Sequence, residues 1–272
     1  MLVISSHQYQ FAFQFGSKGK KQGQFDEPWG IAVNDKSRTL AVADSNNERV
    51  QMFDFDGNFL GEIALESETS SVAFTETGDL LSNVESDDNK LTLYTEGGQF
   101  IGHISDEQVK TPWYISVGSD GRIITCNLAD KTIKVLSPDG EDLLQSFSAP
   151  GCDEDPCCAV YQQKKFFVSY PVANRVMVFN NVGEYLYDID SKGSGDGQFS
   201  CPTGLAIDEF NGLIVCDRDN NRLQLLTLDG KYVAKVAGSF FHHNTHLADC
   251  AVSNTGHCFV TDTNKDCVCV FN

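Results

Sequence analysis

The apolar positions of this chain fall into short runs that return in a fixed order. An apolar triplet opens each unit and recurs at intervals of 41 to 46 residues. A second apolar run follows, then a run that alternates apolar and polar residues, then a turn such as Asp56-Gly57, then a fourth run. Alternation with period two is typical of half-buried strands, and Asp-Gly of tight hairpins. The six triplets are Ile31–Val33, Val72–Phe74, Ile115–Val117, Ala159–Tyr161, Leu205–Ile207 and Cys250–Val252.

Each unit therefore predicts four short antiparallel strands, which is the pattern of a propeller blade. The first three runs occur six times, but only five fourth runs follow them. Residues Phe11–Phe15 have the pattern of Phe59–Ala64, so we expect the N-terminal strand to complete the sixth blade and leave no free sheet edge. The expected fold is all-β: a six-bladed β-propeller as one domain over residues 9–272, with a short tail at residues 1–8 and no helix.

A second repeat lies between the second and third runs, where "DSNNERVQ" (44–51) returns as "DRDNNRLQ" (217–224). An aspartate at a strand end can accept N–H groups of the following turn, asparagine tolerates a left-handed backbone, and arginine can pair back to the aspartate. We therefore interpret this motif as structural. In the second blade Glu85 and Lys90 are expected at the aspartate and arginine positions. The structural residues are Asp44, Asn47, Asp217, Asn220 and Asp262.

These residues resemble the NHL repeat. Blade one has Phe15-Gly16, Gly23-Gln-Phe25 and Pro28-Trp-Gly-Ile-Ala-Val33 ahead of its aspartate motif, and blade five has Gly197-Gln-Phe199 and Pro202-Thr-Gly-Leu-Ala-Ile207. The order of these motifs along the chain is similar to that in the C-terminal propeller of animal tripartite-motif (TRIM-NHL) ubiquitin ligases. The resemblance implies a module that binds a protein partner or ubiquitylation substrate, and several such propellers bind RNA.

In that family a RING, B-boxes and a coiled coil precede the propeller. This chain contains none of them, and the zinc-ligand spacings that a RING needs are absent. The resemblance therefore implies the recognition module of a longer protein, or a stand-alone relative. We do not expect this chain to transfer ubiquitin itself.

The charge of the chain limits the kinds of partner that we expect it to bind, and its cysteine positions indicate the cellular compartment. The formal net charge is −18, and residues 62–107 hold eleven acids against one base, Lys90. Such a field argues against nonspecific binding of DNA, other nucleic acid or an acidic membrane. Six of the ten cysteines lie in apolar strand-like runs, as reduced core residues do. No apolar stretch is long enough to span a bilayer, and we expect a cytoplasmic protein.

One face of the propeller gathers the candidate ligand-binding residues. In NHL propellers the loops between second and third strands share a face with the blade-to-blade connections. Basic side chains mixed with aromatic ones suit a single-stranded RNA, and the same residue types dominate protein-binding hot spots. Three interpretations stay open: the tryptophans only pack over the first strands, the face binds a protein, or it binds RNA. The acidic charge ranks RNA below protein. The candidates are Lys18, Lys20, Lys21, Trp29, Arg49, Lys90, Trp113, Tyr114, Lys131, Arg175, Lys192 and Arg222.

The sequence does not favour an enzyme. Lactonases and a lyase on similar propellers hold calcium or zinc with side chains that converge from several blades. Here only His242, His243 and His246 cluster, in one loop that we interpret as polar rather than metal-binding. No catalytic serine–histidine–aspartate or phosphate-cradling pattern occurs. We expect neither metal nor cofactor, and no catalytic activity.

Overall fold

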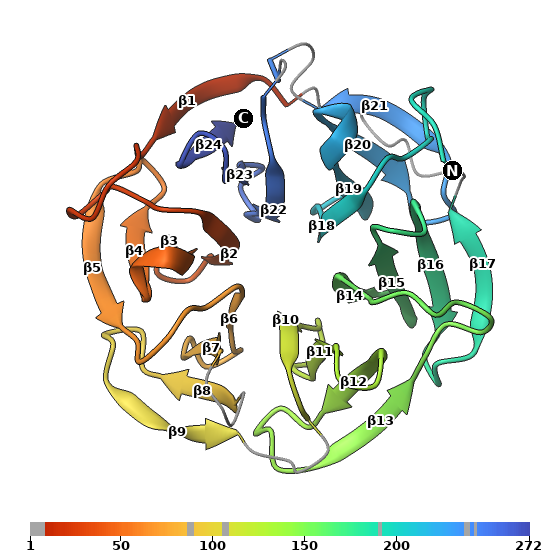
Figure 1. Cartoon of the computed structure of the whole chain (residues 1–272), viewed down its shortest axis with the longest axis horizontal. Helices are drawn as coiled ribbons and strands as arrows, with labels where there is room; N and C mark the ends of the chain where they lie inside the picture. The colour runs from red at the N-terminus through yellow and green to blue at the C-terminus, as the bar shows by residue number, and fades with distance from the viewer. Residues whose placement is uncertain (1–8, 86–89, 105–108, 190–191, 237–239, 242–243) are drawn as a thin grey trace.

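The structure is a computed structural model that describes residues 9–85, 90–104, 109–189, 192–236, 240–241 and 244–272. Six four-stranded antiparallel sheets stand around a central axis like the blades of a propeller, as Figure 1 shows. In each blade the first strand lies nearest the axis and the fourth forms the outer rim. The all-β, six-bladed fold expected from the repeat is confirmed.

The strand bounds follow the predicted runs closely. Blade one consists of β2 (Pro28–Asn34), β3 (Thr39–Asp44), β4 (Arg49–Asp54) and β5 (Phe59–Ala64). Blade two consists of β6 (Val72–Phe74), β7 (Leu80–Val84), β8 (Lys90–Tyr94) and β9 (Phe100–Ile104). Blade three consists of β10 (Pro112–Val117), β11 (Ile123–Asn127), β12 (Thr132–Leu136) and β13 (Leu143–Phe147).

The second half of the ring repeats this order, and its last blade is closed by the first strand of the chain. Blade four consists of β14 (Cys158–Gln162), β15 (Lys165–Tyr170), β16 (Arg175–Asn180) and β17 (Tyr185–Ile189). Blade five consists of β18 (Pro202–Ile207), β19 (Gly212–Asp217), β20 (Arg222–Thr227) and β21 (Tyr232–Val236). Blade six consists of β22 (Leu247–Val252), β23 (Cys258–Asp262), β24 (Cys267–Phe271) and β1 (Phe11–Phe15).

The N-terminal strand closes the ring as predicted. β1 pairs antiparallel with β24, with Phe11 opposite Phe271 and Phe15 opposite Val268. Phe15 also reaches the next blade, where its ring centroid lies 4.9 Å from that of Phe53 on β4. The two ends of the chain thus hold one sheet together, and an aromatic contact ties that sheet to its neighbour.

Apolar side chains fill the spaces between neighbouring blades, because each twisted sheet buries both of its faces against the next. Strands β3, β19 and β23 are buried along their whole length.

The expectation of no helical element was wrong, because the structure contains two single turns of 3-10 helix, η1 (Ser45–Asn47) and η2 (Arg218–Asn220). Within the described ranges, no helix has the length and apolar character needed to cross a bilayer.

The first strands converge so tightly at the axis that two of them need glycine. A Cβ atom on Gly30 of β2 would lie 2.7 Å from the Cα of Ser71, and one on Gly204 of β18 would lie 2.5 Å from the Cα of Asp249. Both distances are shorter than any real Cβ contact. The Pro-x-Gly pattern of blades one and five therefore follows from the close approach of neighbouring blades.

Candidate binding face and central channel

The blade-to-blade connections and the loops between second and third strands lie together at one end of the ring, which we name the loop face. Hydrogen bonds join a connection to the loop of the preceding blade. The Glu27 N–H donates to Asp266 Oδ1 at 3.0 Å, and the Cys201 N–H donates to Asn174 Oδ1 at 3.0 Å. On this face, hydrogen bonds therefore join blade six to blade one and blade four to blade five.

The repeated aspartate motif ties each blade to the segment that enters it. In blade one the buried Asp44 accepts the N–H of Asp26 at 2.7 Å, and Arg49 Nε donates to Asp44 Oδ2 at 2.7 Å. The guanidinium of Arg49 also donates to the carbonyls of Lys21 and Gln24 at 3.0 and 2.9 Å. The motif thus anchors the entering segment.

Blade five repeats this network. Asp217 accepts the Ser200 N–H at 2.7 Å and the Arg222 Nε–H at 2.6 Å. Asn220 Nδ2 donates to Asp217 and to the Gly193 carbonyl at 2.8 Å. In blade six Asp262 accepts the His246 N–H at 2.9 Å. All three aspartates therefore bind an N–H of the preceding connection.

Three details of the expected motif geometry were wrong. The first N–H partner of Asp44 comes from the entering segment instead of the following turn. The left-handed backbone belongs to Glu48, one residue after Asn47, because Asn47 closes the 3-10 turn. In blade two the strand register places Val84 opposite Lys90, so an apolar residue holds the position that we assigned to Glu85.

Most of the candidate cations are already bound to carboxylates or carbonyls. Arg49 and Arg222 are only 8% exposed and belong to the networks above, so they do not offer a free guanidinium to a ligand. Lys18, Lys131 and Arg175 pair with Asp26, Asp153 and Asp188 at 3.2, 2.9 and 2.9 Å. Lys90 is half-buried at the start of β8. Lys20, Lys21 and Lys192 are exposed and make no ion pair with any residue that the structure describes.

Trp29 and Trp113 meet at the mouth of the central channel. Their ring centroids lie 5.7 Å apart at 75°, and the ring of His246 stands 5.7 Å from Trp29 at 83°. Both tryptophans are half-buried. They come from blades one and three and meet over blade two, which has the small Ser70 at the matching position. Burial and the positive charge of Arg218 lower the pKa of His246, which favours the neutral imidazole.

Below the tryptophans a buried carboxylate lies inside the channel. Asp249 of β22 accepts the Ile31 N–H at 3.1 Å, the Cys250 N–H at 2.9 Å and the Tyr114 hydroxyl at 3.3 Å. Burial raises the pKa of Asp249 to about 7. Tyr114, which we expected on the loop face, instead directs its hydroxyl into the channel because Asp249 binds it there. The space between these groups is about 10 Å³, which is enough for about one water molecule.

Asp249 was missed by the sequence analysis, although a signal for it exists. The same repeat position holds Gly30, Tyr114, Cys158 and Gly204 in other blades, and all of them line the channel. Blades one and five need glycine at this position because neighbouring strands approach closely there. An aspartate at the same position of blade six is therefore a sign of a buried carboxylate. Among the described residues, no three His, Cys, Asp or Glu side chains are close enough to hold a metal ion, and His242 and His243 lie outside those residues.

Comparisons with known proteins agree with the repeat. A family model described as NHL repeat matches residues 25–53, and one described as a 6-bladed beta-propeller matches residues 158–267. The chain is 30% identical over 149 residues to protein brain tumor of Drosophila melanogaster. It is 30% identical over 143 residues to the B-box type zinc finger protein ncl-1 of Caenorhabditis elegans. The expected resemblance to NHL-repeat propellers is confirmed.

These matches cover 52% and 50% of this chain but only 14% and 17% of the two relatives, so the chain spans less than a fifth of their length.

Solved structures share the fold at low sequence identity. A streptogramin B lyase superposes with a TM-score of 0.71 at 13% identity, covering 96% of this chain and 97% of the other. A putative gluconolactonase superposes with a TM-score of 0.72 at 16% identity, covering 97% and 94%. At such identities the likeness shows the fold alone.

Proposed function

We propose that this propeller is a recognition module that binds a protein partner through its loop face, with the Trp29–Trp113 pair as the anchor. The observation that carries the proposal is the half-exposed tryptophan pair at the channel mouth. Tryptophan is enriched among residues that contribute most to protein–protein binding, because it buries a large area at a small entropic cost. These two are the only tryptophans in the chain, and both stand on this face.

The electrostatics of the face favour a protein over RNA. An RNA needs several cations free to contact phosphates, and each such contact adds to the salt dependence of binding. Here five of the candidate cations are bound within the protein, at Lys18, Arg49, Lys131, Arg175 and Arg222. A protein segment can use the tryptophan pair without any free cation. Because the acidic excess is concentrated in blade two, we expect a partner anchored on the tryptophan pair at the channel mouth to extend over blades one, three and five rather than outward over blade two.

By its resemblance to tripartite-motif propellers, the module would recruit a ubiquitylation substrate if a longer protein carries it. One matched relative is itself called a B-box type zinc finger protein. We propose a binding role for the module and no catalytic one.

Affinity capture from cell lysate tests the proposal. The wild-type chain is compared with Trp29→Ala/Trp113→Ala and with a control, Leu60→Ala/Leu186→Ala, which removes two exposed apolar side chains from the outer rim. Equal melting temperatures are verified first. We expect specific protein partners that the tryptophan variant loses and the control keeps. Partners captured equally by all three proteins would exclude the tryptophan pair as the anchor.

RNA binding is the second candidate function, and one observation favours it. Lys20, Lys21 and Lys192 are exposed within the segments that enter blades one and five, on the same face as the tryptophans. A random RNA pool tests it in a salt titration. If RNA is the ligand, Lys20→Ala/Lys21→Ala/Lys192→Ala will lower the affinity and reduce the slope against salt by about one per lost phosphate contact. An unchanged slope would exclude these lysines as phosphate contacts.

A further inference from the structure

The segment that enters blade one fills the seam between blades six and one. We name residues 16–27 the lead-in of blade one. Its Phe25 is fully buried, and the Phe25 ring centroid lies 5.6 Å from that of Phe53 on β4 and 6.4 Å from that of Phe15 on β1. The lead-in therefore wedges an aromatic ring between two blades.

Side chains of β4 hold the backbone of this lead-in. Gln51 Nε2 donates to the Gln24 carbonyl at 2.7 Å, and Gln51 Oε1 accepts the Gly23 N–H at 2.9 Å. Arg49 Nη2 donates to the same Gln24 carbonyl at 2.9 Å. The third strand of the blade thus binds the backbone of Gly23 and Gln24, next to a buried aromatic ring.

Blade five builds the same arrangement independently. Phe199 is fully buried in its seam, and Gln224 Nε2 and Arg222 Nη2 donate to the Gln198 carbonyl at 2.8 and 2.7 Å. The Gly197 N–H donates to Gln224 Oε1 at 2.9 Å. Two blades of the same chain therefore show which kind of segment this position accepts.

The seam between blades one and two lacks such a lead-in and is open. β5 ends at Ala64 and β6 begins at Val72, so the connection is shorter and contains no Gly-x-Phe sequence. On β8, Lys90, Thr92 and Tyr94 stand at the positions that hold the arginine, glutamine and phenylalanine of blade one. These three residues line a cleft of about 390 Å³, which we name the blade-two cleft. That volume lies within the range of ligand-binding pockets.

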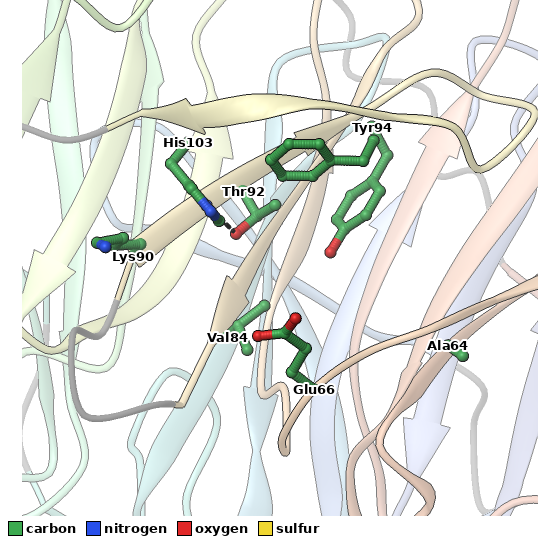
Figure 2. Close-up of a pocket in the computed structure, with 8 residues that line it drawn as sticks. Ala64, Glu66, Val84, Lys90, Thr92, Tyr94 and His103 are labelled. Carbon is green, nitrogen blue, oxygen red and sulfur yellow. Dashed lines mark hydrogen bonds between the residues drawn. The ribbon is translucent and has the colours of Figure 1, made fainter.

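The walls of the blade-two cleft combine aromatic surface with an acid. The rings of Tyr94 and Phe100 meet edge to face, with their centroids 6.1 Å apart. The ring centroid of His103 lies 5.1 Å from that of Phe100. Figure 2 shows Glu66 entering the cleft from the side opposite Tyr94 and His103. Glu66 is exposed and makes no ion pair with any described residue. Phe100 is 53% exposed, which is unusual for a phenylalanine and indicates an incompletely covered apolar wall.

We propose that the blade-two cleft is a docking site for a segment of a partner protein that carries an aromatic residue preceded by lysine or arginine. The aromatic ring takes the place in this seam that Phe25 and Phe199 take in theirs, against Tyr94. The basic side chain pairs with Glu66 and is attracted by the acidic excess of residues 62–107. The partner thus supplies in trans the lead-in that blade two lacks.

A peptide copied from the protein's own lead-in is the probe. Residues 16–25, GSKGKKQGQF, contain the aromatic residue and three lysines. The peptide is synthesised with an amidated C-terminus and a fluorophore, and binding to the full chain is measured by fluorescence anisotropy. We expect saturable binding that weakens at least about tenfold when the phenylalanine is replaced by alanine, since truncation of a buried aromatic anchor commonly costs at least that much affinity.

Two pairs of variants locate the peptide. Ala64→Trp fills the cleft from the exposed end of β5. Its control, Ser148→Trp, introduces a tryptophan at an exposed position directly after β13 of blade three. Glu66→Lys reverses a charge inside the cleft, and Glu68→Lys reverses one on an exposed residue outside it. We expect at least a tenfold loss of affinity for Ala64→Trp and for Glu66→Lys, and less than a threefold change for their controls.

The proposal does not rest on the proposed function of the loop face. The Trp29→Ala/Trp113→Ala variant is expected to bind the peptide with unchanged affinity, so the two proposals fail separately. No saturable binding at millimolar peptide would overturn the docking site. Binding that survives Ala64→Trp, or that is lost equally in Ser148→Trp, would also overturn it, because the peptide would then occupy another place.

Discussion

The hydroxyl of Tyr114 donates to Asp249 Oδ1 at 3.3 Å, across the central channel and across 135 positions of sequence. Tyr114 belongs to blade three and Asp249 to blade six, which stand on opposite sides of the ring. A single hydrogen bond thus links two blades that share no sheet edge. Because Asp249 is buried, its charge state is coupled to folding.

The first prediction concerns the pH dependence of stability. The pKa of Asp249 rises from 3.8 to about 7 on folding, so the folded protein binds this proton more tightly than the unfolded chain. The contribution is therefore fully present below pH ~4 and is lost as pH rises to 7, at no more than about 1.4 kcal/mol per pH unit. Urea unfolding of the wild type and Asp249→Asn at pH 5, 6, 7 and 8 measures it.

We expect the free energy of unfolding of the wild type to fall between pH 5 and 7 relative to that of Asp249→Asn, and the difference to level off above pH 7. The comparison cancels the opposite contribution of His246, whose lowered pKa favours stability at higher pH. Parallel pH profiles for the two proteins would contradict a raised pKa at Asp249.

Ring closure by β1 is the basis of the second prediction. Phe15 packs on Phe53 at 4.9 Å and on Phe25 at 6.4 Å, so Phe15→Ala should lower the free energy of unfolding by about 3 kcal/mol. Gln14→Ala, at an exposed position of the same strand, should change it by less than about 0.5 kcal/mol. Deleting residues 1–16 should free the edge of β24 and cause aggregation. A monomeric deletion with an unchanged melting temperature would contradict the closure.

The third prediction concerns the buried ion pair of blade five. Asp217→Ala leaves Arg222 buried without its carboxylate and should cost about 3 kcal/mol. Asp219→Ala removes the exposed partner of Arg218 in the same loop and should cost less than about 1 kcal/mol. Chemical denaturation of both variants compares them directly. Equal losses would show that burial does not distinguish the two pairs.

Thiol reactivity provides the fourth prediction. Burial raises the pKa of Cys126 well above its ordinary value, and the thiolate is the form that reacts. Cys152 is half-buried, so iodoacetamide at pH 7.5 should label it well before Cys126, Cys216 and Cys250, as followed by mass spectrometry. In urea all ten should react at similar rates. Equal rates for Cys126 and Cys152 in the folded protein, or native disulfides, would contradict this order.

Several features of the fold could be predicted from the sequence because they depend on local periodicity. A strand that buries one or both faces needs apolar residues at regular spacing, and a tight hairpin needs glycine, so the runs and turns specify blades wherever they occur. The single unmatched strand, Phe11–Phe15, was enough to predict how the ring closes. The pairing of Arg49 with Asp44 follows from the same local pattern, since both flank one short turn.

Only the tertiary structure decided what lies at the axis and in the seams. Trp29 meets Trp113, and Tyr114 meets Asp249, because six first strands converge on one channel, and no local pattern records which side chains face each other there. The burial of Arg49 depends on carbonyls of a separate segment, which removed it from the exposed cations. The blade-two cleft is open because a neighbouring connection is short. The contacts of Trp29, Tyr114 and Arg49 join segments that are far apart in the sequence. The closure of the ring brings these segments together, so a local sequence pattern cannot specify the contacts.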